Sequence, residues 1–192
     1  MFKKIFIILV TIIIIAGCSA NETQGDIDSN ENLQNQSEVT KGLLKINPPS
    51  MKKEILNDSK KNVLAWLVEV EKWKINVLSL PSDSFDEFDK KAIEEELEQV
   101  FSKEEVTELI NLFYSYNVET IKYTKKDINY ASLNADWQNE VDIKKLQEED
   151  LFSIIVNSIN KNSDVEMSML FEWIAQNADG NLKFKSFNIK LN

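Results

Sequence analysis

The chain has 192 residues, of which 43% are hydrophobic and 28% are charged, and its formal net charge is -10. All 22 basic residues are lysines, there is no histidine, and Cys18 is the only cysteine. This composition excludes imidazole-based catalysis, zinc sites with histidine ligands and an intramolecular disulfide, and its negative charge argues against nucleic acid as a partner.

The first 17 residues have the organisation of a secretory signal peptide. Lys3 and Lys4 precede an apolar run over residues 5 to 15 that only Thr11 interrupts. The run is shorter than the roughly 20 apolar residues that a membrane-spanning helix needs. Sequence alone therefore predicts a signal peptide over residues 1–17.

A short motif follows the apolar run directly. It consists of an aliphatic residue, two small residues and a cysteine, and resembles the bacterial lipobox: Ile15, Ala16, Gly17 and Cys18. The resemblance implies cleavage before Cys18 and a diacylglycerol anchor on its sulfur, with acyl chains of the palmitate type. Two acyl chains hold a protein stably on a membrane. A lipoprotein on the extracytoplasmic face of the cell membrane is expected, and the alternative is a free cysteine in a signal peptide cleaved nearby.

The segment after Cys18 is expected to be a tether. Residues 19–41 contain only four apolar side chains and show neither a helical nor a strand period. Such a segment cannot bury enough apolar surface to offset the entropy of ordering. We therefore expect residues 18–49 to be the lipidated cysteine and a disordered tether, and residues 50–192 to form a single α+β domain.

Three amphipathic helices are predicted between residues 50 and 117. Pro48, Pro49 and Ser50 form a helix-start signal, and apolar residues then recur every three or four positions as far as Leu78. A second helix is predicted from the capping box of Ser84 and Glu87 to Phe101. Cap chemistry repeats at Ser102 and Glu105 and predicts a third helix that ends near Asn117.

Beyond Val118 the spacing of apolar residues changes toward the period of two that strands show. Strands are predicted over residues 119–124, 127–134 and 141–144. Residues 151–159 are ambiguous between helix and strand, and the β-branched run at 154–156 favours a strand. Strict alternation over residues 167–175, a turn at 177–180 and a returning segment at 181–191 predict a closing hairpin.

The last strand contains a break in its alternation. Leu182 and Phe184 share one parity, whereas Phe187, Ile189 and Leu191 share the other. One extra residue near Lys185 and Ser186 would place all five on the same face. The sequence therefore predicts a β-bulge there.

Helices followed by an antiparallel meander predict an α+β fold with three N-terminal helices packed on a curved antiparallel β-sheet. With Trp66 and Trp73 on the long leading helix, a helix pair hinged at Phe101 and Ser102, and the closing hairpin, the chain resembles the NTF2-like and cystatin-like small lipoproteins of bacteria. The resemblance implies a sheet that curves around the long helix, often leaving a concave pocket. It rests on element order, and no strand is predicted between the second and third helices, where many members have one.

Acidic side chains are concentrated in residues 83–108. Eleven acids and three lysines give this region a net charge of -8. It contains no closely spaced oxygen ligands with glycine in a turn, as a calcium loop would. A solvated helix face is the simplest interpretation, and a docking face for a basic partner is the alternative.

No residue is predicted to be catalytic, and no metal or cofactor is expected. Paired carboxylates would have to come from Glu172 with Asp136 or Glu140, and the serines have no histidine to act as their base. Tyr123, Tyr130 and Asp127 are of types that some NTF2-like enzymes use in their pockets, but no motif is matched. An enzymatic interpretation would require a buried cluster of Asp, Glu and Tyr side chains.

Two functions of different classes remain for the domain. The first is a non-catalytic protein-interaction domain, as an accessory of a membrane or cell-wall assembly, with an exposed apolar patch rimmed by the acidic helices. The alternative is a small-ligand binding domain with a pocket between the long helix and the sheet. The candidate pocket residues are Trp66, Trp73, Phe171, Trp173 and Phe184. In both cases the membrane is the expected partner, through the diacylglycerol on Cys18.

Overall fold

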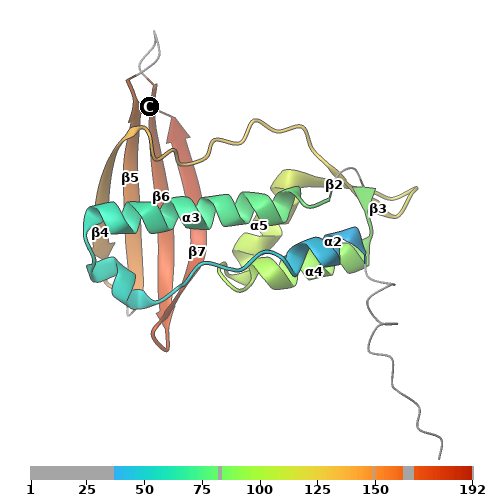
Figure 1. Cartoon of the computed structure of the whole chain (residues 1–192), viewed down its shortest axis with the longest axis horizontal. Coiled ribbons are helices and arrows are strands. Elements are labelled where there is room, and N and C mark those ends of the chain that lie inside the picture. Colours follow the sequence, from blue (N-terminus) through green and yellow to red (C-terminus); the bar gives the residue numbers. More distant parts are fainter. Residues whose placement is uncertain (1–36, 82–83, 149, 162–166, 192) are drawn as a thin grey trace, which may run out of the picture. The chain divides into compact units, whose positions relative to one another are not determined.

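The protein is represented by a computed structural model that describes residues 37–81, 84–148, 150–161 and 167–191, all within the unit of residues 36–192 (Figure 1). The expected signal peptide, the lipobox with Cys18 and the expected tether as far as residue 36 lie outside the described residues. Among the residues that are described, no helix is long and apolar enough to cross a membrane.

The described residues form an α+β fold with two antiparallel sheets. The main sheet is a meander of β4 (Gln138–Lys145), β5 (Leu151–Asn160), β6 (Met167–Ala178) and β7 (Asn181–Leu191). The small sheet has the order β1 (Ser84–Phe85), β3 (Lys122–Lys125) and β2 (Tyr114–Asn117). Figure 1 shows the two sheets toward opposite ends of the long helix α3 (Lys60–Ser79).

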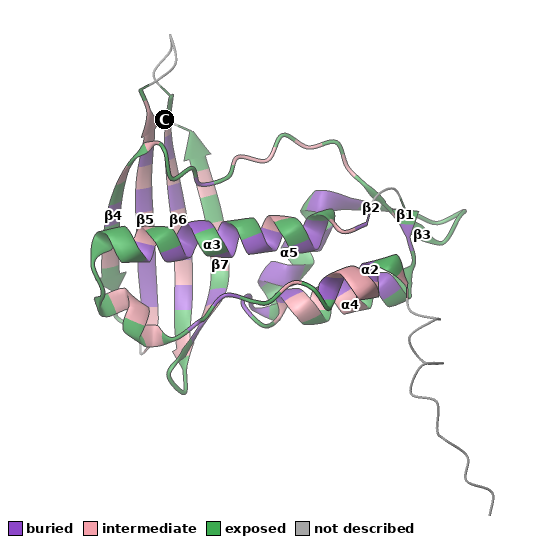
Figure 2. Cartoon of the chain, viewed as in Figure 1, coloured by how far each residue is buried: buried purple, intermediate pink, exposed green. Residues whose placement is uncertain are grey.

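Helix α3 covers one face of the main sheet. Its apolar residues recur at the predicted spacing, and they are buried against the sheet and the other helices (Figure 2). The expected start at Ser50 is wrong, because the helix begins after Ser59, whose side chain accepts a hydrogen bond from the Asn62 N–H at 3.2 Å. The preceding backbone is committed to the closing hairpin, where the Lys53 N–H donates to the Gly180 carbonyl at 3.0 Å. Only the short 3-10 helix η1 (Lys53–Asn57) forms before it.

The second helix, α4 (Glu87–Leu97), begins two residues later than predicted. Asp86 is its N-cap and accepts from the Asp89 N–H, whereas Ser84 belongs to β1 and pairs with Thr124. The chain beyond Leu97 does not continue as a helix to Phe101, because Phe101 forms a bridge to Phe184 of β7. Strand pairing of Ser84 and of Phe101 thus makes the helix shorter than predicted at both ends.

The third helix, α5 (Lys103–Phe113), starts as predicted. The Ser102 hydroxyl accepts from the Glu105 N–H at 3.3 Å. The helix ends at Phe113 rather than near Asn117, because residues 114–117 form β2 and pair with β3. The aromatic sequence Tyr-Ser-Tyr suits a strand as well as a helix, and the small sheet decides between them.

The folded unit includes part of the segment expected to be a tether. Helix α2 (Glu38–Leu43) buries Val39 and Leu43 and is capped by Ser37. It packs on α4, where the Ser37 hydroxyl donates to the Asp89 carboxylate. The prediction of a tether as far as residue 49 is therefore wrong for residues 37–49, where two apolar side chains suffice because α4 supplies the surface that covers them.

The strand predictions have mixed outcomes. Residues 151–159 are a strand, β5, which pairs with β4 on one side and β6 on the other. The segment predicted as a strand at 119–124 is reduced to β3, and the one at 141–144 extends to the full length of β4. Residues 127–134 form no strand, and this irregular segment passes along α3 to reach β4 (Figure 1).

The predicted bulge in β7 is confirmed. Ile174 lies opposite Ser186 while Ala175 lies opposite Phe184, so Lys185 is the extra residue. The insertion places Phe184 and Phe187 on the same face as Trp173. Without it, every apolar side chain after Phe184 would point away from the core.

Candidate functional site

The five aromatic residues predicted to line a pocket do meet between α3 and the main sheet. They are all buried, and their rings contact one another, with centroids 5.6 Å apart for Trp66 and Phe184 and 6.0 Å apart for Phe171 and Trp173. Trp73 stacks on Phe101, which in turn contacts Phe184. These residues therefore form the packed hydrophobic core, and the space in which a pocket was expected is filled by their own side chains.

A cluster of charged and phenolic groups lies inside this core. Lys74 is fully buried, and its Nζ donates to Oε1 of Glu71 and to the hydroxyl of Tyr130, each at 2.6 Å. Nζ also lies 4.2 Å from the ring centre of Phe187. A buried ammonium is stable only when it is paired and surrounded by such groups. We call Glu71, Lys74, Glu105 and Tyr130 the Lys74 cluster.

The cluster is assembled from three parts of the fold. Glu71 and Lys74 stand three residues apart on α3, between the buried residues Leu67 and Leu78. Glu105 lies in the first turn of α5, and Tyr130 comes from the irregular segment after β3. A signal was present in the sequence, since two opposite charges interrupt the apolar stripe of α3 at helical spacing, but it did not identify their partners.

Glu105 is the titratable member of the cluster at neutral pH. Burial raises the pKa of its carboxyl to about 7, and the negative charge of Glu108 acts in the same direction. The charge of Lys74 and the Phe187 backbone N–H, which donates to the carboxylate, oppose this change. Burial also raises the pKa of the Tyr130 hydroxyl, assisted by the charges of Glu71 and Glu105. Tyr130 therefore keeps its proton.

One member of the cluster reaches the surface of a groove. Glu71 lines a cavity of about 770 Å³ between α3, residues 131–137 and β6. Its Oε2 is buried and has no hydrogen-bond partner among the described residues. Just over half of the lining residues are apolar: Val68, Ile75, Ala131, Leu133, Ala135, Trp137 and Met169. The other lining residues besides Glu71 are polar or charged: Lys72, Asn76, Ser132, Asn134 and Asp136. We call this cavity the Glu71 groove.

The Glu71 groove offers an acceptor rather than a pair of proton-transfer groups. Lys74 neutralises the Glu71 carboxylate through Oε1, and Oε2 is left without a hydrogen-bond partner among the described residues. An uncompensated buried acceptor carries a desolvation penalty of about 1–3 kcal/mol, which a bound donor would relieve. The buried cluster of Glu and Tyr that catalysis would require is present, but of its four members only Glu71 lines the groove.

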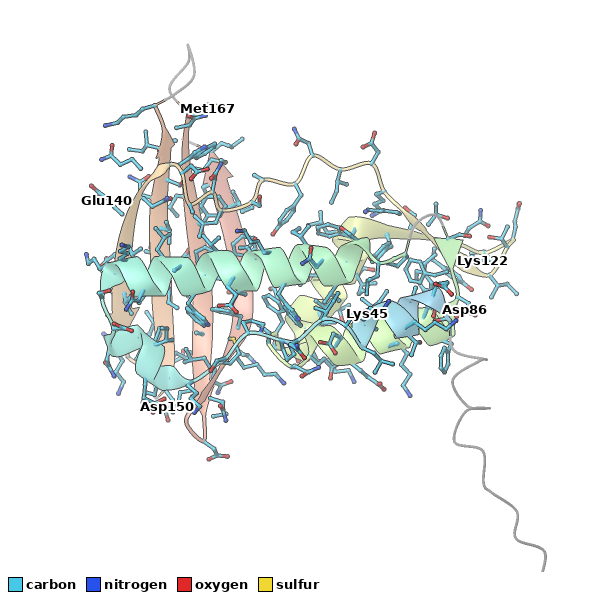
Figure 3. All side chains as sticks on the ribbon, viewed as in Figure 1. Lys45, Asp86, Lys122, Glu140, Asp150 and Met167 are labelled. Atoms are coloured by element: carbon cyan, nitrogen blue, oxygen red, sulfur yellow. The ribbon has the colours of Figure 1, made fainter. Side chains whose placement is uncertain are left out.

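The other carboxylates considered from sequence are not brought together with the cluster. Glu172 lies on the opposite face of β6 from Phe171 and Trp173 and accepts from the Ser153 hydroxyl at 3.3 Å. Asp136 lines the groove, whereas Glu140 lies at the outer end of the main sheet (Figure 3). Within the part of the chain that is described, no three acidic or cysteine side chains are placed to hold a metal ion.

No family model matches the chain, and no curated protein and no solved structure is significantly similar to it.

Proposed function

We propose that the protein is a lipid-anchored, extracytoplasmic lipoprotein whose domain binds a small ligand in the Glu71 groove without transforming it. The signal peptide and lipobox pattern that ends at Cys18 support the anchor. The observation that carries the binding function is that Glu71 lines a partly apolar groove, while its buried Oε2 has no hydrogen-bond partner among the described residues. The finer NTF2-like or cystatin-like arrangement remains part of this proposal, supported by a long helix that crosses an antiparallel meander.

The groove selects for ligand chemistry. Its apolar walls favour a hydrocarbon or aromatic body, and the acceptor favours an ammonium, amide or hydroxyl group that donates a hydrogen bond. A carboxylate ligand is disfavoured, because the two acidic residues that line the groove, Glu71 and Asp136, outnumber its one lysine, Lys72. We therefore propose that ligands carry an apolar body and a neutral or cationic donor head.

The arrangement supports binding without catalysis. Efficient acid–base chemistry needs a proton-transfer group within hydrogen-bond reach of the substrate. The Lys74 ammonium is enclosed by Glu71, Tyr130 and aromatic rings, and Glu105 is also buried. A bound ligand would thus meet one carboxylate already paired with a lysine.

Titration with simple probes tests the groove. Hexylamine and hexanoate share an apolar chain and differ in head group, and binding is followed by the fluorescence of Trp137, which lines the groove. We expect hexylamine to bind and hexanoate to bind at least tenfold more weakly. Equal binding of the two probes, or no binding of hexylamine at any accessible concentration, would contradict the proposal.

A matched pair of variants locates the effect. Glu71→Gln keeps the size of the side chain, and its amide oxygen still accepts from Lys74. The amide NH2 group then takes the place of Oε2, so that a donor replaces the free acceptor. Glu69→Gln alters an exposed carboxylate one half-turn away. Hexylamine binding should be lost in the first variant and unchanged in the second. The Trp137→Phe variant checks that the fluorescence signal arises in the groove.

The anchor is tested separately. Cys18→Ser should move the protein from the membrane fraction of the source cells into the soluble extracytoplasmic fraction. The intact mass of the wild-type protein should exceed that of the mature polypeptide by the mass of its lipid. Attachment of the serine variant as tight as that of the wild type would refute the lipid anchor without bearing on the groove.

The protein-interaction domain is the second candidate function. One observation favours it, since Phe88 is 69% exposed on the acidic helix α4. An exposed aromatic among carboxylates suits a partner with an apolar pocket and a basic rim. A photo-crosslinking residue at position 88 in intact cells should capture a defined partner, and the same residue at position 69 should not.

A further inference from the structure

We propose that the hairpin of β2 and β3, residues 114–125, rests on the surface of the membrane that holds the lipid anchor. This inference rests on the proposed anchoring at Cys18 and is independent of the Glu71 groove. We call this segment the membrane hairpin.

The membrane hairpin exposes the side chains that partition into a membrane interface. Val118 is 78% exposed, Ile121 is 67% exposed and Tyr116 is 49% exposed. Lys122 and Lys125 are also exposed. Lys122 follows the apolar tip directly, whereas Lys125 lies opposite Tyr114 at the other end of β3. Aliphatic side chains enter the boundary between headgroups and acyl chains, tyrosines sit at headgroup level, and lysines contact anionic lipid.

The backbone holds this tip in a fixed and unusual conformation. Asn117 Oδ1 accepts from the N–H groups of Glu119 and Thr120 at 2.9 and 3.1 Å. Ile121 has a φ of 56°, in the left-handed region that β-branched residues rarely adopt. Glycine or asparagine would adopt this backbone conformation with less strain, and the exposed Ile121 side chain contributes little to core packing. Burial of this side chain in a lipid surface would offset the strain.

The membrane hairpin lies where the chain from Cys18 enters the domain. Ser37, the first described residue, bonds to Asp89 of α4, and the Tyr123 hydroxyl of β3 donates to Glu87 of the same helix at 2.7 Å. Figure 3 shows Lys122 and Asp86 at one end of the domain, far from Glu140 and Met167. Residues 19–36 separate Cys18 from Ser37 and span at most about 60 Å when extended.

Charge also favours a lipid surface over a basic partner at this place. The membrane hairpin itself carries Lys122 and Lys125 against Glu119, and Lys126 follows immediately. The neighbouring Glu87 is engaged by Tyr123 and by Lys90, whose Nζ lies 3.0 Å from its Oε1. The hairpin is thus a positive, apolar projection beside an acidic helix, and its positive charge favours contact with anionic headgroups.

Fluorescence quenching in the lipidated full-length protein tests the proposal. Val118→Cys and, as a control, Glu140→Cys each receive an environment-sensitive fluorophore, because the Cys18 thiol is blocked by its lipid. The proteins are reconstituted into vesicles of phosphatidylcholine and phosphatidylglycerol that carry lipid-attached quenchers. We expect a blue-shifted emission and severalfold stronger quenching at position 118 than at position 140. Equal solvent exposure of both positions would overturn the proposal.

Variants in a chain without its lipid provide a second readout. In the full-length Cys18→Ser chain, Ile121→Asn removes the apolar tip while suiting the positive φ, so loss of binding cannot be attributed to unfolding. Lys122→Gln with Lys125→Gln removes the charge. Binding to phosphatidylglycerol vesicles, measured by co-sedimentation, should weaken severalfold with the first variant. It should weaken by about 25-fold with the second, at about fivefold per lysine. Unchanged co-sedimentation of both would overturn the proposal.

The lipid anchor and the membrane hairpin can be refuted by different outcomes. Shielding of position 118 that appears only when other membrane proteins are present assigns the membrane hairpin to a protein partner and overturns the lipid assignment. A native chain whose mass shows no lipid on Cys18 refutes the anchor. In that case the co-sedimentation of the Cys18→Ser chain, with and without Ile121→Asn, decides for or against the membrane hairpin alone.

Discussion

Replacing Lys74 with methionine tests whether the buried carboxylate of Glu71 is stabilised by Lys74 alone. Methionine keeps the aliphatic stem of lysine and removes the ammonium. Lys74 Nζ lies 2.6 Å from Glu71 Oε1, and the two side chains are 0% and 2% exposed. The variant therefore leaves a buried carboxylate with neither of its oxygens paired, together with a Tyr130 hydroxyl that loses its donor.

The size of the effect follows from leaving a buried charge without its partner. Removing one partner of a buried ion pair destabilises a protein by about 3–5 kcal/mol. We therefore expect Lys74→Met to lower the free energy of unfolding by about 3–5 kcal/mol at pH 7.

Urea denaturation followed by far-ultraviolet circular dichroism at pH 7 measures this loss. Adding Glu71→Gln to Lys74→Met removes the ionisable group and should recover most of the stability at pH 7. Lys72→Met, at an exposed position on the same helix, should change stability by no more than about 0.5 kcal/mol. A loss below about 1 kcal/mol at pH 7, or a double variant as unstable as Lys74→Met alone, would refute the reasoning.

The remaining predictions concern Glu105 and the bulge. The folded-state pKa of Glu105 is raised to about 7 from 4.5, so its contribution to stability is fully present below pH 4.5 and is lost as the pH rises through 7. Relative to Glu105→Gln, the wild type should lose about 2 kcal/mol of unfolding free energy between pH 5 and pH 8. The exposed control variant Glu69→Gln should lose as much as the wild type over this range. Parallel pH profiles for Glu105→Gln and the wild type would disprove the assignment. Deletion of Lys185 moves Phe187 off the core face and should abolish cooperative thermal unfolding, while Lys185→Ala should retain it; a deletion variant that melts like the wild type would show that the register is not fixed by the bulge.

Local pattern alone was sufficient for much of the main architecture. Strict alternation predicted the closing hairpin, and the change of parity between Phe184 and Phe187 located the bulge at Lys185, because a strand can keep apolar side chains on one face only by inserting a residue. Ser102 likewise marked the start of α5, since its hydroxyl satisfies an N–H that the first helical turn leaves free.

Local pattern failed where distant backbone competed for the same groups. Pro48, Pro49 and Ser50 form a helix-start signal, but the backbone groups of Met51 and Lys53 hydrogen-bond with the closing hairpin instead. Residues 114–117 continue the apolar pattern of α5 and are drawn into the small sheet by β3. The polar composition of residues 37–43 predicts a disordered segment, but helix α2 forms because α4 covers Val39 and Leu43.

The candidate site shows the same division. From sequence came the composition that excludes imidazole chemistry, the lipobox pattern at Cys18, and the aromatic residues that meet between α3 and the sheet. Sequence did not show that these rings fill their own space, or that Glu71, Lys74, Glu105 and Tyr130 meet in the core. Periodicity reports which side of an element is buried. What each buried group faces depends on segments remote in the chain, and only the tertiary structure places Glu71 in a groove and Ile121 at an exposed tip.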